Sequence, residues 1–257
     1  MTVKLPVPGV KKIIAVAAGK GGVGKSTVSA NIAAGLGKFG LKVGIADLDI
    51  FGPSVPTLLN IHDQPEAENN MLIPIEKYDI QTMSIGYLVD ESKAAIWRGA
   101  MVTKTLFQLI RGVKWDVDVL VLDLPPGTGD VILSLGEGYK IDGFVIVATP
   151  QKLALKDVQK AISACRKLEQ PIVGIVENMS GLVVNNEKME IFGKNELTNF
   201  VNENELDILG SLTIDPLLAK SCDEGLPYVL SNNYNTDNML EIKKICEKIV
   251  DFLRVAG

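Results

Sequence analysis

A run of glycines, a lysine and two hydroxyl residues near the N-terminus has the spacing of a phosphate-binding loop. Residues 19 to 26 match Gly-x-x-x-x-Gly-Lys-[Ser/Thr] at every position. Because glycine has no Cβ, such a loop can turn its backbone N–H groups inward around an anion, with the positive end of the next helix behind them. In this chemistry Lys25 contacts the β and γ phosphates of a nucleotide, and the Ser26 hydroxyl ligates Mg²⁺. The loop residues expected to bind the nucleotide are Gly19, Lys20, Gly21, Gly22, Val23, Gly24, Lys25, Ser26 and Thr27.

The same glycines fit a second pattern, which leaves an alternative open. Gly19, Gly21 and Gly24 also satisfy the dinucleotide fingerprint Gly-x-Gly-x-x-Gly, and Asp47 follows 23 residues after Gly24, at the end of the next apolar run. That fingerprint does not require a lysine and two hydroxyl residues directly after the last glycine. An apolar run precedes the loop and a helical pattern follows it, so we favour the phosphate-loop interpretation.

Three aspartates that follow apolar runs are candidates to complete the site. Asp123 ends the run at 119–122, which is the Walker B pattern, and we expect it to hold Mg²⁺ together with Ser26. Asp47 and Asp49 lie two residues apart, so both side chains share one side of an extended backbone. We expect Asp47 to support the metal shell and Asp49 to orient the attacking water, because open α/β sheets bind ligands at the carboxyl ends of their strands. The alternative for Asp49 is a loop residue that caps backbone groups.

Two further segments bear on nucleotide recognition. Gly127-Thr128-Gly129-Asp130 follows the Walker B run, and it either senses the γ phosphate or forms a turn that caps the next helix. Guanine-specific sites use Asn/Thr-Lys-x-Asp, and this tetrad does not occur in the sequence. Asn178, which follows the apolar run at 172–176, can offer an amide donor and acceptor to the edge of adenine. The sequence therefore favours ATP as the nucleotide.

Apolar runs alternate with helical patterns along the chain, which predicts an α/β protein. Because the runs are apolar throughout, we expect a mostly parallel central sheet covered by helices on both faces. We predict that residues 1–257 form a single P-loop nucleotide-binding domain with an extended lead-in at 1–10. The predicted strands are 13–17, 41–46, 80–85, 117–122, 143–149, 172–176 and 209–214. The predicted helices are 28–36, 101–111, 153–168 and 238–254.

Composition argues against several classes of protein. Hydrophobic residues make up 47% of the 257 residues, which argues against disorder. The net charge of −5 and the lack of a basic run argue against nucleic-acid binding. No apolar stretch is long enough to span a membrane. Three well-separated cysteines, Cys165, Cys222 and Cys246, and the lack of a signal-peptide pattern predict a cytoplasmic location.

Taken together, the motifs resemble those of a known family. The loop with its additional Lys20 is similar to the deviant Walker A motif of the MinD/ParA group of P-loop ATPases. Further segments narrow the resemblance to the Mrp/ApbC family of ATP-binding iron–sulfur cluster carriers, from about Val7 to Pro227. They are Asp47-Leu-Asp49-Ile-Phe-Gly-Pro-Ser54, Trp97-Arg98-Gly99, Asp123-Leu-Pro-Pro-Gly-Thr-Gly-Asp130, Thr149-Pro150-Gln151, Glu177-Asn-Met-Ser180, Ile191-Phe-Gly193 and Asp223-Glu-Gly225-Leu-Pro227.

The resemblance implies a MinD/ParA-like P-loop fold, slow ATP hydrolysis with Mg²⁺, and a role in assembling or delivering iron–sulfur clusters. It also implies a homodimer in which Lys20 reaches the nucleotide phosphates of the partner subunit, as an arginine finger does. Lys20, Lys25 and Asp49 are then the catalytic residues. The further partners that it implies are iron–sulfur scaffold proteins or apo-target proteins.

One segment departs from the family's pattern. Family carriers place a Cys-x-x-Cys pair between the motifs at 177–180 and 191–193, so that two subunits hold one 4Fe–4S cluster by four thiolates. In this chain residues 181–190 contain no cysteine, and the segment predicts a hairpin with Asn185 and Asn186 at its turn. The sequence therefore identifies no cluster ligand, and we expect a partner to hold the cluster.

An ATP-switched regulatory or positioning protein of the MinD or ParA kind, without a cluster, is the alternative. A MinD relative would carry a C-terminal amphipathic helix with a basic face for the membrane. The predicted helix at 238–254 mixes acidic and basic residues, which favours a helix packed on the core. A ParA relative would need a basic DNA-binding surface, whereas the pI of this chain is near 5.1.

Overall fold

A parallel sheet forms the centre of the molecule. The computed structural model describes residues 4–88, 100–127, 129–185, 187–232 and 236–255. In spatial order the eight strands of the sheet are β12 (Ile208–Ser211), β9 (Ile172–Glu177), β8 (Gly143–Ala148), β1 (Val10–Ala18), β7 (Val117–Asp123), β2 (Val43–Asp47), β6 (Ile80–Ser84) and β5 (Ile75–Lys77). The first seven are parallel to one another, and the edge strand β5 pairs antiparallel with β6.

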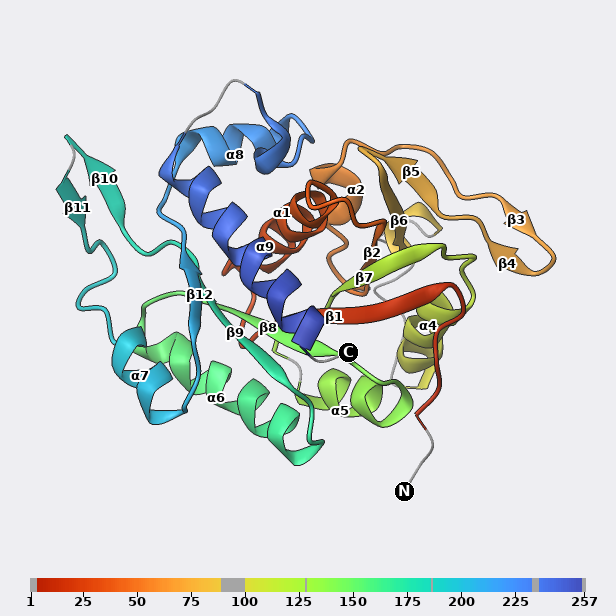
Figure 1. Ribbon diagram of the computed structural model, residues 1–257, viewed down its shortest axis with the longest axis horizontal. Coiled ribbons are helices and arrows are strands. Elements are labelled where there is room, and N and C mark those ends of the chain that lie inside the picture. The colour runs from red at the N-terminus through yellow and green to blue at the C-terminus, as the bar shows by residue number, and fades with distance from the viewer. Residues whose placement is uncertain (1–3, 89–99, 128, 186, 233–235, 256–257) are drawn as a thin grey trace.

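The helices of the described residues form layers on the two faces of this sheet (Figure 1). They are α1 (Lys25–Gly37), α2 (Val55–Leu58), α4 (Ala100–Arg111), α5 (Gly129–Gly138), α6 (Lys152–Lys167), α7 (Leu197–Glu203), α8 (Pro216–Asp223) and α9 (Asp237–Val255), with the 3-10 turns η1 (Ile85–Tyr87) and η2 (Tyr228–Leu230). Helices α1 and α9 pack on each other and on one face, whereas α5, α6 and α7 pack together on the other.

The strands that carry the candidate site are buried from both faces. Every residue of β2 and β8 is buried, and so are the last six residues of β1. A strand covered on both sides must be apolar along its whole length, which is why these strands appear in the sequence as continuous apolar runs. Because the strands are parallel, the residues that follow β1, β2, β7, β8 and β9 meet at one edge of the sheet.

The predicted α/β class and mostly parallel sheet are confirmed. Each predicted strand overlaps an observed one, and the largest difference at the start of a strand is in β1, which begins at Val10 rather than at residue 13. The predicted C-terminal helix is also confirmed. In α9 the side chains of Ile242, Ile245 and Ile249 are buried, so its apolar face is used within the molecule. None of the described helices is both long and apolar enough to cross a membrane.

Two small hairpins project from the body of the molecule (Figure 1). The hairpin predicted around residue 185 is confirmed by β10 (Leu182–Val184) and β11 (Glu187–Met189). The second hairpin is formed by β3 (Ala67–Glu68) and β4 (Met71–Leu72). The motif at 97–99 and Thr128 of the 127–130 segment lie outside the described residues.

Candidate nucleotide site

The glycine loop connects β1 to α1 at the carboxyl edge of the sheet. Gly22 and Gly24 have φ angles of 80° and 83°, in the left-handed region where a Cβ is strained, so glycine is required at both positions. Gly24 is the N-cap residue of α1, and Val28 N–H donates to its carbonyl at 3.0 Å. The loop borders a cleft of about 280 Å³. Its lining residues are Lys20, Gly21, Gly22, Gly24, Lys25, Ser26, Thr27, Asp49, Ser54, Leu58 and Pro126.

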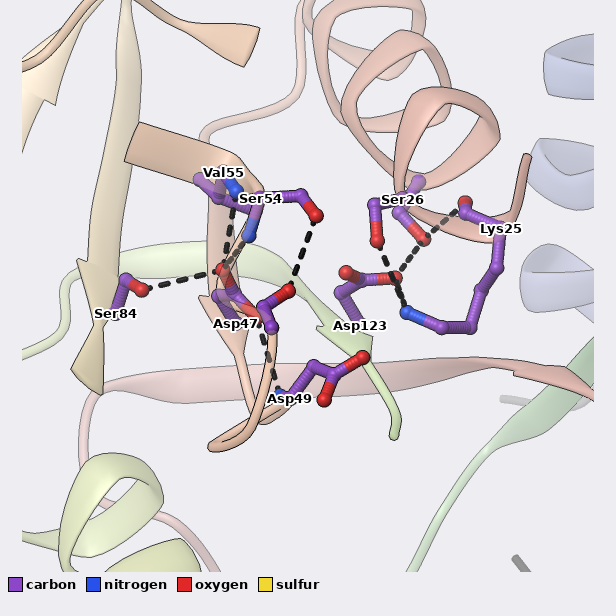
Figure 2. Close-up of polar contacts among 10 residues, drawn as sticks. Lys25, Ser26, Asp47, Asp49, Ser54, Val55, Ser84 and Asp123 are labelled. Atoms are coloured by element: carbon purple, nitrogen blue, oxygen red, sulfur yellow. Dashed lines mark hydrogen bonds and ion pairs between the residues drawn. The ribbon is translucent and has the colours of Figure 1, made fainter. Parts of the chain in front are cut away.

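Lys25 and Asp123 form a buried ion pair at the floor of the site (Figure 2). Lys25 Nζ lies 2.6 Å from Asp123 Oδ1 and donates to Ser26 Oγ at 3.1 Å. The same Asp123 oxygen accepts from Ser29 Oγ at 2.7 Å. Two regions that are 98 residues apart in the chain thus meet because β7 lies next to β1 in the sheet. The structure brings together the three residues that the sequence assigned to the phosphates and the metal.

The donor set around Asp123 fits a Mg²⁺ ion. Asp123 Oδ2 is buried and has no hydrogen-bond partner among the described residues. A buried carboxylate oxygen without a donor is costly, and a metal or its bound water satisfies such an atom. The Ser26 hydroxyl, which accepts from the same Lys25 ammonium that pairs with Asp123, offers a second oxygen of the kind that Mg²⁺ prefers.

Asp47 is fully buried, and hydrogen bonds engage both of its carboxylate oxygens (Figure 2). Its Oδ1 accepts from Asp49 N–H at 3.1 Å. Its Oδ2 accepts from the N–H groups of Ser54 and Val55 at 2.9 and 3.0 Å and from Ser84 Oγ at 3.1 Å. Burial and the nearby Asp123 carboxylate raise the pKa of Asp47 to about 7, against the opposing effects of the Val55 and Asp49 N–H groups and of the Lys25 charge. Asp47 therefore holds the 48–55 loop in place, a role the sequence did not indicate, and its part in the metal shell remains a prediction.

Asp49 follows Asp47 and lines the cleft. Its carboxylate is half-buried and is turned toward the Lys25 ammonium in Figure 2. Burial raises the pKa of Asp49, and the positive charge of Lys25 opposes that rise. The position suits a group that accepts a hydrogen bond from water in the cleft, and the assignment of that role remains a prediction.

Lys20 also lines the cleft, and it contacts the N-cap residue of α6. Its Nζ donates to Gln151 Oε1 at 3.2 Å, across 131 residues of sequence. This contact gives the Thr149-Pro150-Gln151 segment a place in the site that sequence reasoning missed. Whether Lys20 acts on the nucleotide of a second subunit remains a prediction.

Asn178 lies under the glycine loop. Its Nδ2 donates to Val23 O at 2.8 Å, and the side chain is buried. A Cβ on Gly24 would stand 2.2 Å from this nitrogen, so the loop backbone rests directly on the amide. The amide donor that was expected to read adenine is thus engaged by the loop itself, and base recognition by Asn178 remains a prediction.

The three cysteines lie on three different helices, α6, α8 and α9. Burial raises the pKa of Cys165 and of Cys246 to about 12, and it also raises the pKa of Cys222. Cluster ligation requires thiolates. Among the described residues, no group of three or more His, Cys, Asp or Glu side chains is arranged to hold a metal ion. That this chain supplies no cluster ligand remains a prediction.

The similarity to known proteins decides the family. A family model described as ParA, NUBPL iron-transfer P-loop NTPase, matches residues 9–250. The chain belongs to this family. An iron–sulfur cluster carrier protein of Aquifex aeolicus is 43% identical, over 98% of this chain and 71% of the relative. The iron–sulfur cluster transfer protein NUBPL of Dictyostelium discoideum is 41% identical, over 98% of this chain and 80% of the relative. The resemblance to iron–sulfur cluster carriers stated from the sequence is confirmed.

Solved structures agree with the fold, and two of them are described as nucleotide complexes. A nucleotide-binding protein of Archaeoglobus fulgidus in complex with ADP aligns with a TM-score of 0.73 at 33% identity, covering 86% of this chain and 88% of that one. The septum site-determining protein MinD of Pyrococcus horikoshii, complexed with Mg-ADP, aligns with a TM-score of 0.74 at 20% identity, covering 96% and 99%. At that lower identity the likeness shows a shared fold, which confirms the MinD-like architecture.

Proposed function

We propose that this protein binds ATP with Mg²⁺ in the cleft beside the glycine loop and hydrolyses it to ADP and phosphate. The observation that carries the proposal is the convergence of Lys25, Ser26 and Asp123 at one end of the cleft, with one buried carboxylate oxygen of Asp123 left for a metal. Family membership and the ADP complex of the Archaeoglobus relative support it.

The reaction is an in-line attack of water on the γ phosphorus of ATP. The oxygen of water forms the new bond to phosphorus as the bond to the β–γ bridging oxygen breaks, and ADP carries away the electron pair. Lys25 and the N–H groups of the loop hold the phosphates, and Asp49 accepts a hydrogen bond from the water and orients it. Mg²⁺ held by Ser26 and Asp123 would neutralise charge on the phosphate oxygens. Lys25 exchanges its ion pair with Asp123 for the phosphates when nucleotide enters.

Two measurements test this part of the proposal. Isothermal titration with ATP, ADP and GTP should show binding of both adenine nucleotides and weaker binding of GTP, because the guanine-specific tetrad is absent from the sequence. Phosphate release should require Mg²⁺ and should fall strongly in Asp49→Asn while ATP binding persists. Full turnover by Asp49→Asn would remove Asp49 from the mechanism.

We further propose that hydrolysis requires two copies of this chain, with Lys20 acting on the nucleotide of the partner. Lys20 already lies at the cleft, where its contact to Gln151 holds it in the single chain. Lys20→Ala should lower turnover and abolish any ATP-dependent dimer seen by light scattering, whereas Lys11→Ala, at the opposite end of β1, should change neither. Unchanged dimerisation and turnover in Lys20→Ala would refute the role.

The process that uses this ATP is the assembly or delivery of iron–sulfur clusters, with the cluster held by a partner protein. The names of the Aquifex and Dictyostelium relatives support the process. The absence of a cysteine from residues 181–190 and the raised pKa values of the three thiols support a partner as cluster holder. Anaerobic reconstitution followed by iron and sulfide counting should find no stoichiometric cluster on the purified chain. A cluster that bridges two chains would overturn this assignment.

A further inference from the structure

The four residues between β9 and β10, at 178–181, combine backbone strain with buried polar atoms. Met179 has a φ of 55°, in the left-handed region that bulky residues rarely adopt. Ser180 Oγ is buried and has no hydrogen-bond partner among the described residues. Strain and unsatisfied polar groups are kept where surrounding contacts impose them, and they collect at functional segments. The two preceding residues, Glu177 and Asn178, make buried side-chain contacts with distant parts of the chain.

Asn178 contacts the nucleotide loop. Its amide donates to Val23 O at 2.8 Å, and a Cβ on Gly24 would stand 2.2 Å from the same nitrogen. The contact joins residues 155 apart in sequence, and Asn178 is only 8% exposed. Any movement of the loop backbone at Val23 therefore displaces the Asn178 side chain.

Glu177, the preceding residue, contacts a different part of the molecule. One oxygen of its carboxylate accepts from Asn195 Nδ2 at 2.5 Å, and the other accepts from Ser211 Oγ at 2.6 Å. Asn195 Oδ1 in turn accepts from Leu197 N–H at the start of α7. Glu177 is 3% exposed, so this buried carboxylate holds the chain where it returns from the β10–β11 hairpin.

The β10–β11 hairpin is attached to the rest of the molecule on both sides. On its leading side Gly181 O accepts from Ile214 N–H at 2.8 Å, and Leu182 forms a parallel bridge with Ile214. On its trailing side the attachment is Glu177 to Asn195. Glu177 ends β9 and Asn178 directly follows it, so adjacent residues contact the base of the hairpin and the nucleotide loop.

We propose that Glu177 and Asn178 are a pair of positioning residues through which the nucleotide loop and the β10–β11 hairpin set each other's conformation. The inference rests on the nucleotide binding proposed above. A nucleotide shifts the hairpin only if it favours one arrangement of the loop over another, and the coupling is then reciprocal: a molecule that holds the hairpin changes nucleotide affinity by the same factor. The strained Met179 backbone directly follows this pair, on the way to the hairpin.

Hydrogen exchange of the full chain with and without Mg-ADP tests the proposal. In the wild-type protein ADP should slow exchange of the amides at 182–185 and 187–189 by about threefold or more, although these residues do not line the cleft. Asn178→Ala should weaken ADP binding by about tenfold, because the loop loses a hydrogen bond and its support. It should also remove the effect of ADP on the hairpin.

The variant Glu177→Gln tests whether the response of the hairpin can be lost while ADP binding is kept. This variant should bind ADP within about twofold of the wild-type affinity, yet ADP should no longer slow exchange in the hairpin. Matched controls are Asn199→Ala and Glu203→Gln, exposed residues of α7, which should keep both the affinity and the protection. If Asn178→Ala does not fold, as judged by circular dichroism, the result for Glu177→Gln alone tests the coupling between the nucleotide loop and the hairpin.

The outcomes distinguish the inference from the function on which it rests. If the wild-type protein fails to bind ADP or ATP, the proposed function is wrong. If it binds nucleotide but exchange at 182–185 and 187–189 does not change, the function stands and the coupling is refuted. Protection that persists in Glu177→Gln would likewise refute the role of Glu177.

Discussion

The nucleotide site and the β10–β11 hairpin both lie beyond the carboxyl ends of strands of the parallel sheet, but they are built in opposite ways. At the nucleotide site Lys25 is 6% exposed and Asp123 is 0% exposed, and contacts between distant parts of the chain hold both. On the hairpin, Val183 and Met189 are 47% and 54% exposed. One region is an extension of the core, and the other stands in solvent.

The difference shows that sheet packing fixes the conformation of the nucleotide site, whereas local pairing fixes that of the hairpin. Asp47 and Asp123 are register partners on the parallel strands β2 and β7, so the packing of the sheet positions them. The hairpin is held by three residue pairs and its turn, and an isolated two-stranded hairpin is marginally stable in water. Substitutions should therefore have large effects in the first region and small ones in the second.

The largest effect is expected from Lys25→Ala. The change removes the cation that meets the phosphates and leaves Asp123 as an unpaired buried carboxylate, which costs about 3–5 kcal/mol of stability. ADP affinity measured by titration calorimetry should fall by about 100-fold or more, and the urea midpoint should fall. Lys11→Ala, an exposed lysine paired with Asp118, is the matched control and should change neither. Unchanged affinity would contradict the site assignment.

A large effect confined to the metal-dependent reaction is expected from Asp123→Asn. A neutral amide is a poor ligand for Mg²⁺, so phosphate release measured across a Mg²⁺ series should fall by about 100-fold. ADP affinity in EDTA should change by about threefold at most, because Lys25 and the loop remain. Asp118→Asn, on the same strand but at its more exposed end, serves as the control. Equal losses of affinity with and without Mg²⁺ would show that Asp123 does not act through the metal.

An intermediate effect is expected from Gly24→Ala. The residue has a φ of 83°, and the added Cβ would stand 2.2 Å from Asn178 Nδ2, so strain and a clash combine. Strain of about 1–3 kcal/mol in the binding-competent loop corresponds to roughly 5- to 150-fold weaker ADP binding. Gly22→Ala has the same positive φ with nothing within 4 Å, and it should lose less affinity. A larger loss in Gly22→Ala than in Gly24→Ala would contradict the contact with Asn178.

The smallest effect is expected on the hairpin, from Val183→Thr and Met189→Gln. These side chains are exposed, and the changes leave the Glu177 attachment intact. The free energy of unfolding from urea titrations should change by about 0.5 kcal/mol or less, and ADP affinity by about twofold or less. A loss of more than about 1 kcal/mol would show that the hairpin packs more tightly than its exposure indicates.

The sequence by itself was sufficient for the parts of this protein that depend on local pattern. The glycine loop, the apolar runs of β1, β7 and β8, and the aspartates that end β2 and β7 were all recognisable, because strand, turn and phosphate-loop chemistry are set by neighbouring residues. The order of the sheet then required Asp123 to lie beside the loop, since parallel strands bring their carboxyl ends to one edge.

Only the tertiary structure decided which side chains contact one another across that edge. The donors that engage Asp47 come from the loop after β2 and from β6. Lys20 contacts Gln151, which follows β8. Asn178 supports a loop 155 residues earlier in the chain. No local pattern encodes these pairs, because each depends on where another strand ends and how its loop returns. Sequence spacing predicted that Asp47 and Asn178 belong to the site, and the packing of the strands determined that both support its backbone.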